Sequence, residues 1–123
     1  MSGVLFVALG AFFGAPTRYL LDRAVQARRQ TPMPWGTLTV NVIGSAVLGL
    51  VAGLAVGHDV PREVVLGIGV GFCGALTTFS TFSFETWRLH ESGARRQAVL
   101  NVVLSLAACL TAVTLAHALG SRL

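Results

Sequence analysis

Apolar residues are concentrated in four stretches of the chain, and short polar segments separate these stretches. They cover residues 3–21, 38–56, 64–84 and 99–119. Each is about twenty residues long, the length that an α-helix needs to cross the hydrocarbon core of a bilayer. The pattern predicts an all-α membrane protein in which residues 1–123 form a single domain of four transmembrane helices.

The composition agrees with a membrane protein. Hydrophobic residues make up 54% of the 123 residues and charged residues 11%, whereas a soluble domain carries about 25% charged residues. The first apolar stretch lacks the basic start and short core of a cleavable signal, so we expect it to be retained as a helix. All nine basic residues are arginines. In so apolar a chain, arginines favour contact with lipid headgroups over nucleic acid.

The third apolar stretch contains an unusual run, GFCGALTTFSTFSFE at residues 71–85. Hydroxyl groups should be scarce at membrane depth, yet five fall within seven positions: Thr77, Thr78, Ser80, Thr81 and Ser83. Glycines let a chain unwind, and hydroxyls satisfy the backbone groups that a break in a helix frees. The run therefore predicts a third helix that is broken in mid-membrane. The alternative is a continuous helix with small residues at its packing seams.

Two phenylalanines of this run and two polar side chains outside it need a separate explanation. Asn41 is strongly polar within an apolar stretch, and an amide in hydrocarbon needs hydrogen-bond partners. Phe79 and Phe82 share a helix face, so their positively polarised ring edges could line an anion path. Arg18 lies near the end of the first stretch, where it can reach the headgroups. Interhelical hydrogen bonding, aromatic packing and snorkelling are the plainer explanations of these residues.

Enzyme and metal sites find little support in the sequence. The three histidines share no metal-ligand spacing, the acids do not cluster, and Cys73 has no base near it in the sequence. Both cysteines fall inside apolar stretches, so we expect buried free thiols. The fourth stretch carries a mildly polar stripe at steps of four residues, Asn101, Ser105 and Cys109. We therefore predict that the protein is not an enzyme.

Three motifs of the chain together resemble those of the CrcB/Fluc fluoride channels, which are small dual-topology membrane proteins. The motifs are Gly10-x-x-x-Gly14-Ala15-x-x-Arg18-Tyr19, Gly36-Thr37-Leu38-x-Val40-Asn41-x-x-Gly44 and the run 71–85, whose TTFSTF core is the most specific. The resemblance covers essentially the whole chain. It implies a four-helix subunit that pairs with an inverted copy of itself. This antiparallel homodimer would hold two fluoride pathways and one structural Na⁺ at its symmetry axis.

The resemblance also implies roles for individual residues. Phe79 and Phe82 would line the pores, and Asn41 would donate a hydrogen bond beside them. The other residues of the fluoride pathway would be Thr37, Ser80, Ser105, Arg18 at a vestibule and Glu85 near a pore end. The break in the third helix would lie at Gly74–Thr77, and the backbone carbonyls of these two residues would bind the Na⁺.

The chain departs from the family pattern in two places. Ala11 stands where the family usually has a second glycine. In the fourth stretch, Asn101 and Cys109 flank Ser105 where the family carries tyrosine and serine residues. The resemblance therefore leaves open which of these three side chains complete the polar track of the fourth helix.

The implied function is passive efflux of fluoride across the cell membrane of a prokaryote, and hence resistance to fluoride toxicity. Hydrogen fluoride enters cells uncharged and dissociates in the more alkaline cytoplasm, so the trapped anion can leave through a selective pore. Two alternatives stay open. A small dual-topology multidrug-type exporter would need an embedded acid, but the first stretch has only Asp22 at its end. A non-transporting structural membrane subunit would explain the packing glycines but not the Asn, hydroxyl and Phe cluster.

The arginines are distributed unevenly between the two ends of the predicted bundle. The side formed by the turn 58–63 and the two termini carries only Arg62 and Arg122. The opposite side, formed by the loops 23–34 and 88–96, carries Arg23, Arg28, Arg29, Arg88, Arg95 and Arg96. Arginines near helix ends set topology, so a lone chain should place both termini outside. An inverted homodimer needs both orientations. We expect the homodimer, and a heterodimer with a separately encoded partner of opposite bias is the alternative.

Overall fold

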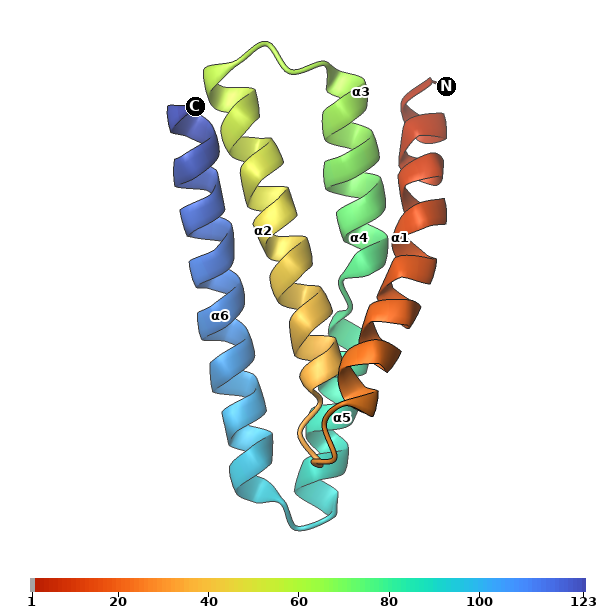
Figure 1. Cartoon of the computed structure of the whole chain (residues 1–123), viewed down its shortest axis with the longest axis vertical. Coiled ribbons are helices and arrows are strands. Elements are labelled where there is room, and N and C mark those ends of the chain that lie inside the picture. Colours follow the sequence, from red (N-terminus) through yellow and green to blue (C-terminus); the bar gives the residue numbers. More distant parts are fainter. Residues whose placement is uncertain (1) are drawn as a thin grey trace.

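The computed structural model describes residues 2–123, which form only helices and the links between them (Figure 1). The elements are α1 (Ser2–Ala27), α2 (Trp35–Gly57), α3 (Arg62–Val64), η1 (Val65–Phe72), α4 (Cys73–Leu76), α5 (Phe79–Glu91) and α6 (Arg95–Arg122). Four segments are long and apolar enough to span a membrane: α1, α2, the run from α3 to α5, and α6. The prediction of an all-helical chain with four such segments is confirmed.

The four segments run alternately in opposite directions. Both termini and the link 58–61 lie at one end of the bundle, and the links 28–34 and 92–94 lie at the other (Figure 1). The helices extend beyond the predicted apolar stretches, since α1 continues to Ala27 and α6 begins at Arg95. Hydropathy marks only the part of a helix that suits hydrocarbon. Arginine, glutamine and alanine favour helix and carry it past that boundary.

The closest helix pair is α2 with α6, which pack along most of their length. Glycines on α2 make this approach possible. A Cβ atom at Gly49 would overlap the carbonyl oxygen of Val113, and one at Gly53 would overlap that of His117. Small residues at such a seam let two backbones touch, which is how membrane helices gain packing energy.

A similar seam joins α1 to the third segment. A Cβ atom at Gly10 would overlap the carbonyl of Gly67, and one at Gly71 would overlap that of Val7. The third-segment side of this seam is η1, a π-helix over Val65–Phe72. No feature of the sequence predicted its wider turns, which are rare and often occur near functional sites.

Two extended residues separate α4 from α5. Thr77 has φ −81° and ψ 156°, and Thr78 has φ −149° and ψ 123°. The sequence predicted that the helix would open at Gly74–Thr77. Gly74 instead lies inside the last turn of α4, because the Thr77 amide still donates to the Cys73 carbonyl at 3.0 Å.

The buried centre of the chain is small. Leu76 and Val40 are fully buried and Asn101 is 1% exposed. Large apolar side chains such as Phe12 and Leu115 lie on the outside, where a soluble protein would expose polar groups. An apolar exterior of this kind is expected for helices that face lipid or another subunit.

Candidate functional site

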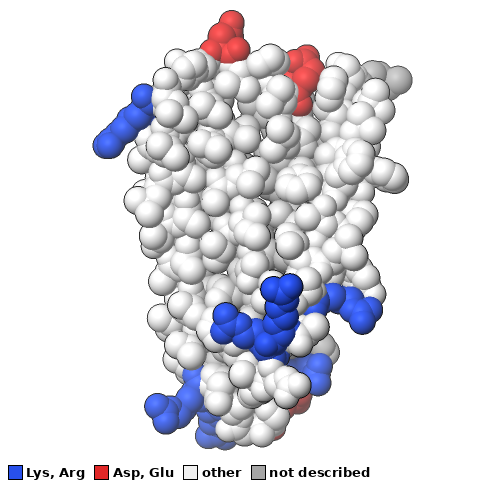
Figure 2. Space-filling view, in the orientation of Figure 1, with Lys and Arg blue, Asp and Glu red and all other residues white. Residues whose placement is uncertain are grey.

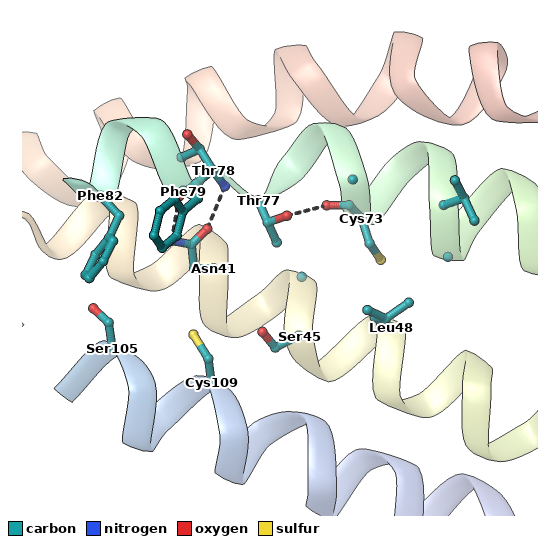
Figure 3. A pocket seen from close by; sticks show the side chains of 14 residues that line it. Asn41, Ser45, Leu48, Cys73, Thr77, Thr78, Phe79, Phe82, Ser105 and Cys109 are labelled. Atoms are coloured by element: carbon teal, nitrogen blue, oxygen red, sulfur yellow. Dashed lines mark hydrogen bonds between the residues drawn. The ribbon is translucent and has the colours of Figure 1, made fainter. Parts of the chain in front are cut away.

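A cavity of about 530 Å³ lies beside the two extended residues (Figure 3). Side chains from α2, η1, α4, α5 and α6 line it together with the link between α4 and α5. Most of the lining is apolar, and its polar side chains are Asn41, Ser45, Thr77, Thr78 and Ser105. An apolar cavity with a few placed polar groups is the usual form of a small-ligand site.

Asn41 binds the extended backbone through both ends of its amide. Its Oδ1 accepts from the Thr78 amide at 2.8 Å, and its Nδ2 donates to the Thr78 carbonyl at 3.1 Å (Figure 3). These two bonds replace helical hydrogen bonds that the interruption removes. An amide nitrogen carries two hydrogens. The second hydrogen of Nδ2 is therefore left for the cavity that Asn41 also lines.

Hydroxyl groups complete both sides of the interruption. Thr78 is the N-cap of α5, because its Oγ1 accepts from the Thr81 amide at 3.2 Å. Thr77 Oγ1 donates to the Cys73 carbonyl at 2.9 Å. Arg18 Nη1 donates to the Thr77 carbonyl at 3.4 Å, so α1 also contacts this segment. The local sequence thus supplies an N-cap for α5 and a side-chain hydrogen bond at the end of α4.

Phe79 and Phe82 lie one turn apart at the start of α5, and both line the cavity. Their ring centroids are 5.6 Å apart and their planes are inclined by 43°. Phe79 is 78% exposed, so most of its ring is free to meet a ligand or another subunit. The ring edges, which carry the positive part of the quadrupole, suit an anion.

The last carbonyls of α4 have no hydrogen-bond donor within residues 2–123. The final backbone bond of this helix ends at the Cys73 carbonyl, which leaves the carbonyls of Gly74, Ala75 and Leu76 without a partner. Apart from Gly74, its chain neighbours and the backbone of its own helix, no atom of residues 2–123 lies within 4 Å of the position that a Cβ would take at Gly74. Free carbonyl oxygens at a helix C-terminus carry partial negative charge and suit a hard cation.

Thr37 and Glu85 form a separate polar contact. Thr37 is 3% exposed, and its hydroxyl donates to Glu85 Oε1. Glu85 lines a second cavity of about 350 Å³, together with Gln26 and Arg88. This pair therefore lies toward the arginine-rich end of the bundle, outside the lining of the larger cavity.

The structure thus brings together some of the predicted pathway residues and separates others. Asn41, Phe79, Phe82 and Ser105 line one cavity, as do both proposed Na⁺ residues, Gly74 and Thr77. Four predicted pathway residues lie outside that lining: Arg18, Thr37, Ser80 and Glu85. Arg18 reaches the Thr77 carbonyl, and Ser80 is exposed and approaches Thr78 Oγ1 at 3.4 Å.

Two residues of this region, Ser45 and Thr78, had no predicted role. Ser45 lines the cavity one turn after Asn41 on α2, a spacing that could have been noticed. Thr78 is both the N-cap of α5 and the partner of Asn41. The Asn41 contact joins residues 37 positions apart, so no local pattern could have revealed it.

Charge is distributed as the sequence predicted. Figure 2 shows most of the arginine side chains at the end that carries the links 28–34 and 92–94, with acidic side chains at both ends. The mid-part of the visible face is uncharged. A molecule with this distribution can sit in a bilayer with its arginines among the headgroups of one leaflet.

Comparison with known proteins relates this geometry to a family. The family model described as "CrcB-like protein, Camphor Resistance (CrcB)" matches residues 5–117. The "Fluoride-specific ion channel FluC 1" of Frankia casuarinae is 53% identical over 94% of both chains. That of Nocardia farcinica is 54% identical over 89% of this chain and 75% of the relative. The "Fluoride-specific ion channel FluC" of Methanocaldococcus jannaschii is 44% identical over 89% of this chain and 87% of its own.

Proposed function

The chain belongs to the CrcB family, and from this membership we propose that it is a fluoride-specific ion channel of the cell membrane. It is not an enzyme: it provides a passive path for the anion and thereby resistance to fluoride. Similar channels occur in bacteria and in an archaeon. The four apolar helices supply the membrane-spanning part. The observation that carries the proposal is the cavity in which Asn41, Phe79 and Phe82 meet.

This cavity offers an anion weak and distributed contacts in place of a strong positive charge. The Phe79 and Phe82 ring edges and the free Nδ2 hydrogen of Asn41 would face the ion. Ser105 and, beyond the cavity, Ser80 would continue the path. Arg18 would raise the anion concentration at one vestibule, and Thr37 and Glu85 would lie at a pore end. Weak contacts of this kind let an ion enter and leave.

The interruption between α4 and α5 would lie in mid-membrane and hold a structural Na⁺. The partnerless carbonyls at the end of α4, with that of Gly74 among them, support this proposal, as does the open space at Gly74. The carbonyl of Thr77 would be a further ligand, although it already accepts from Arg18. Unwound carbonyls and half-helix C-termini are the usual Na⁺ ligands in membrane proteins. Bound there, the cation would neutralise the end of α4 and tie two subunits together.

The functional unit would be an inverted dimer. One subunit leaves Phe79, which lines the cavity, 78% exposed. A second subunit in the opposite orientation would close the cavity and place two equivalent pathways about the shared cation. Inverted repeats around broken helices at the midplane are a recurrent arrangement in transport proteins.

Fluoride efflux from liposomes tests the proposed function. We expect the purified chain, reconstituted into vesicles loaded with potassium fluoride, to release fluoride rapidly when valinomycin is added. Valinomycin lets K⁺ leave together with fluoride, so that no opposing membrane potential builds up. Vesicles loaded with potassium chloride should retain chloride in the same assay. A proton-coupled exporter would need a pH gradient, and a structural subunit would give no flux. Either of these results would contradict the proposed channel.

The side on which the C-terminus lies tests the composition of the dimer. If the chain forms inverted homodimers, a C-terminal tag should be accessible from both sides of the membrane in similar amounts. The six arginines at one end favour a single orientation. A homodimer therefore requires that a similar number of chains insert in the orientation that these arginines disfavour. A single orientation, with fluoride transport only after a second subunit is co-expressed, would establish a heterodimer.

A further inference from the structure

A chain of hydrogen-bonded side chains lies behind the cavity, between α5 and α6. Asn101 is 1% exposed and Ser105 is 6% exposed. Ser105 Oγ donates to Asn101 Oδ1 at 3.3 Å, and Asn101 Nδ2 donates to Thr86 Oγ1 at 2.8 Å. Thr86 Oγ1 in turn donates to the carbonyl of Phe82 at 2.7 Å. The chain connects the cavity wall at Ser105 with the helical turn that carries Phe82.

The direction of these bonds follows from the number of protons available. A threonine hydroxyl has one proton, and that of Thr86 is used on the Phe82 carbonyl. Thr86 Oγ1 can then only accept, so the NH₂ end of Asn101 must face it. The carbonyl end of Asn101 must therefore face Ser105. In the absence of an anion, the single proton of Ser105 points at Asn101, away from any ligand of the cavity.

An anion in the cavity requires a donor, and Ser105 is one of the residues that line it. We propose that Asn101 is a positioning residue for fluoride conduction. It holds the Ser105 hydroxyl at the cavity wall through a long hydrogen bond, and the hydroxyl turns from Asn101 to fluoride when the ion arrives. The inference rests on the proposed channel function and assigns to that path a residue that does not itself line the cavity.

Without Asn101, the Ser105 hydroxyl has a competing partner. A serine within a helix readily donates to the carbonyl four residues earlier, which here is the backbone carbonyl of residue 101. That bond turns the hydroxyl onto α6 and removes it from the cavity. Loss of Asn101 should then cost fluoride the same hydrogen bond as loss of the Ser105 hydroxyl itself.

A double-mutant cycle tests this mechanism. We expect Asn101→Leu and Ser105→Ala each to slow fluoride efflux by about tenfold, as for the loss of one hydrogen bond to an ion. If Asn101 acts through Ser105, the double variant should be no slower than either single variant. A purely structural role would make the two effects multiply, and that result would overturn the inference.

Controls keep this result separate from assembly and from the proposed function. Rates are compared at equal amounts of assembled protein, and Thr114→Val, an exposed polar residue of α6, should leave efflux unchanged. If Asn101→Leu does not assemble, a double-mutant cycle of Thr86→Val with Ser105→Ala tests the inference in its place. Thr86 is suitable because its hydroxyl accepts the hydrogen bond from the Asn101 side-chain amide. A wild-type chain without fluoride flux would overturn the channel function and this inference with it. Wild-type flux with multiplicative effects would overturn the inference alone.

Discussion

Replacement of Asn41 by Asp should abolish fluoride efflux. The carboxylate could still accept from the Thr78 amide, but it could not donate to the Thr78 carbonyl or to an anion. A fixed negative charge ~4 Å from a passing anion costs about 4 kcal/mol at an effective dielectric constant of ~20. That energy corresponds to a loss of roughly a thousandfold in the occupancy of the site. The rate of fluoride release from liposomes measures the effect.

The matched control for this substitution is Gln97→Glu. It makes the same change from amide to carboxylate on α6, in a groove at the arginine-rich end that is separate from the cavity. We expect this variant to conduct like the wild type. Asn41→Asp protein that assembles normally and still conducts at the wild-type rate would remove Asn41 from the fluoride pathway.

Replacement of Gly74 by Leu should abolish transport while leaving the subunit folded. Beyond the chain neighbours of Gly74 and the backbone of its own helix, no atom of the described residues 2–123 lies within 4 Å of a Cβ at this position, so the side chain would enter the cavity that Gly74 lines without disturbing the neighbouring helices. There it would occupy space needed by the proposed Na⁺ and by the proposed second subunit. We expect normal helix content by circular dichroism, loss of the dimer in size-exclusion chromatography, and a fall in efflux of at least about a hundredfold, since loss of the dimer removes both pathways.

Gly71→Leu is the contrasting variant, because a Cβ at Gly71 would overlap the Val7 carbonyl. It should destabilise the subunit itself by at least about 1–3 kcal/mol, the usual cost of overpacking, as measured by thermal unfolding in detergent. If Gly74→Leu lowers the thermal stability of the subunit as much as Gly71→Leu does, Gly74 is required for the fold of the subunit and the open space beside it is not a binding site. If it dimerises and conducts normally, the proposal of a Na⁺ at the end of α4 is wrong.

Hydropathy predicted the four apolar helices because it measures the property that selects them, the free energy of transfer into lipid. It could not set their ends. Residues 22–27 carry charge and yet continue α1, because helix propensity extends beyond the membrane boundary. The π-helical turns of η1, against which α1 packs closely at Gly10, were not predicted either.

The candidate site was predictable in its residue types more than in its contacts. The hydroxyl and phenylalanine run pointed to a segment that lines the cavity, and resemblance to a known family supplied roles, which stay predictions. Gly74 was expected to be part of the opening, but one more helical bond, from Thr77 to Cys73, keeps it in α4. The pairing of Asn41 with Thr78 and of Thr37 with Glu85 joins different helices. Such contacts follow from the packed structure and not from the sequence near either residue.

The seam between α2 and α6 has a consequence for how the bundle keeps its alignment. Gly49, Gly53 and Gly57 recur every four residues, and they face the carbonyls of Val113, His117 and Ser121, which recur at the same interval. A slip of one helix along the other by four residues, about 6 Å, would bring each of these glycines against the next carbonyl with similar close contact. The repeat therefore fixes the spacing of the two helices more firmly than their axial alignment. That alignment depends on Gly120 of α6, where a Cβ would overlap the Leu50 carbonyl of α2, on the short link of residues 92–94, and on the bonds of Asn101, which attach the far end of α6 to α5.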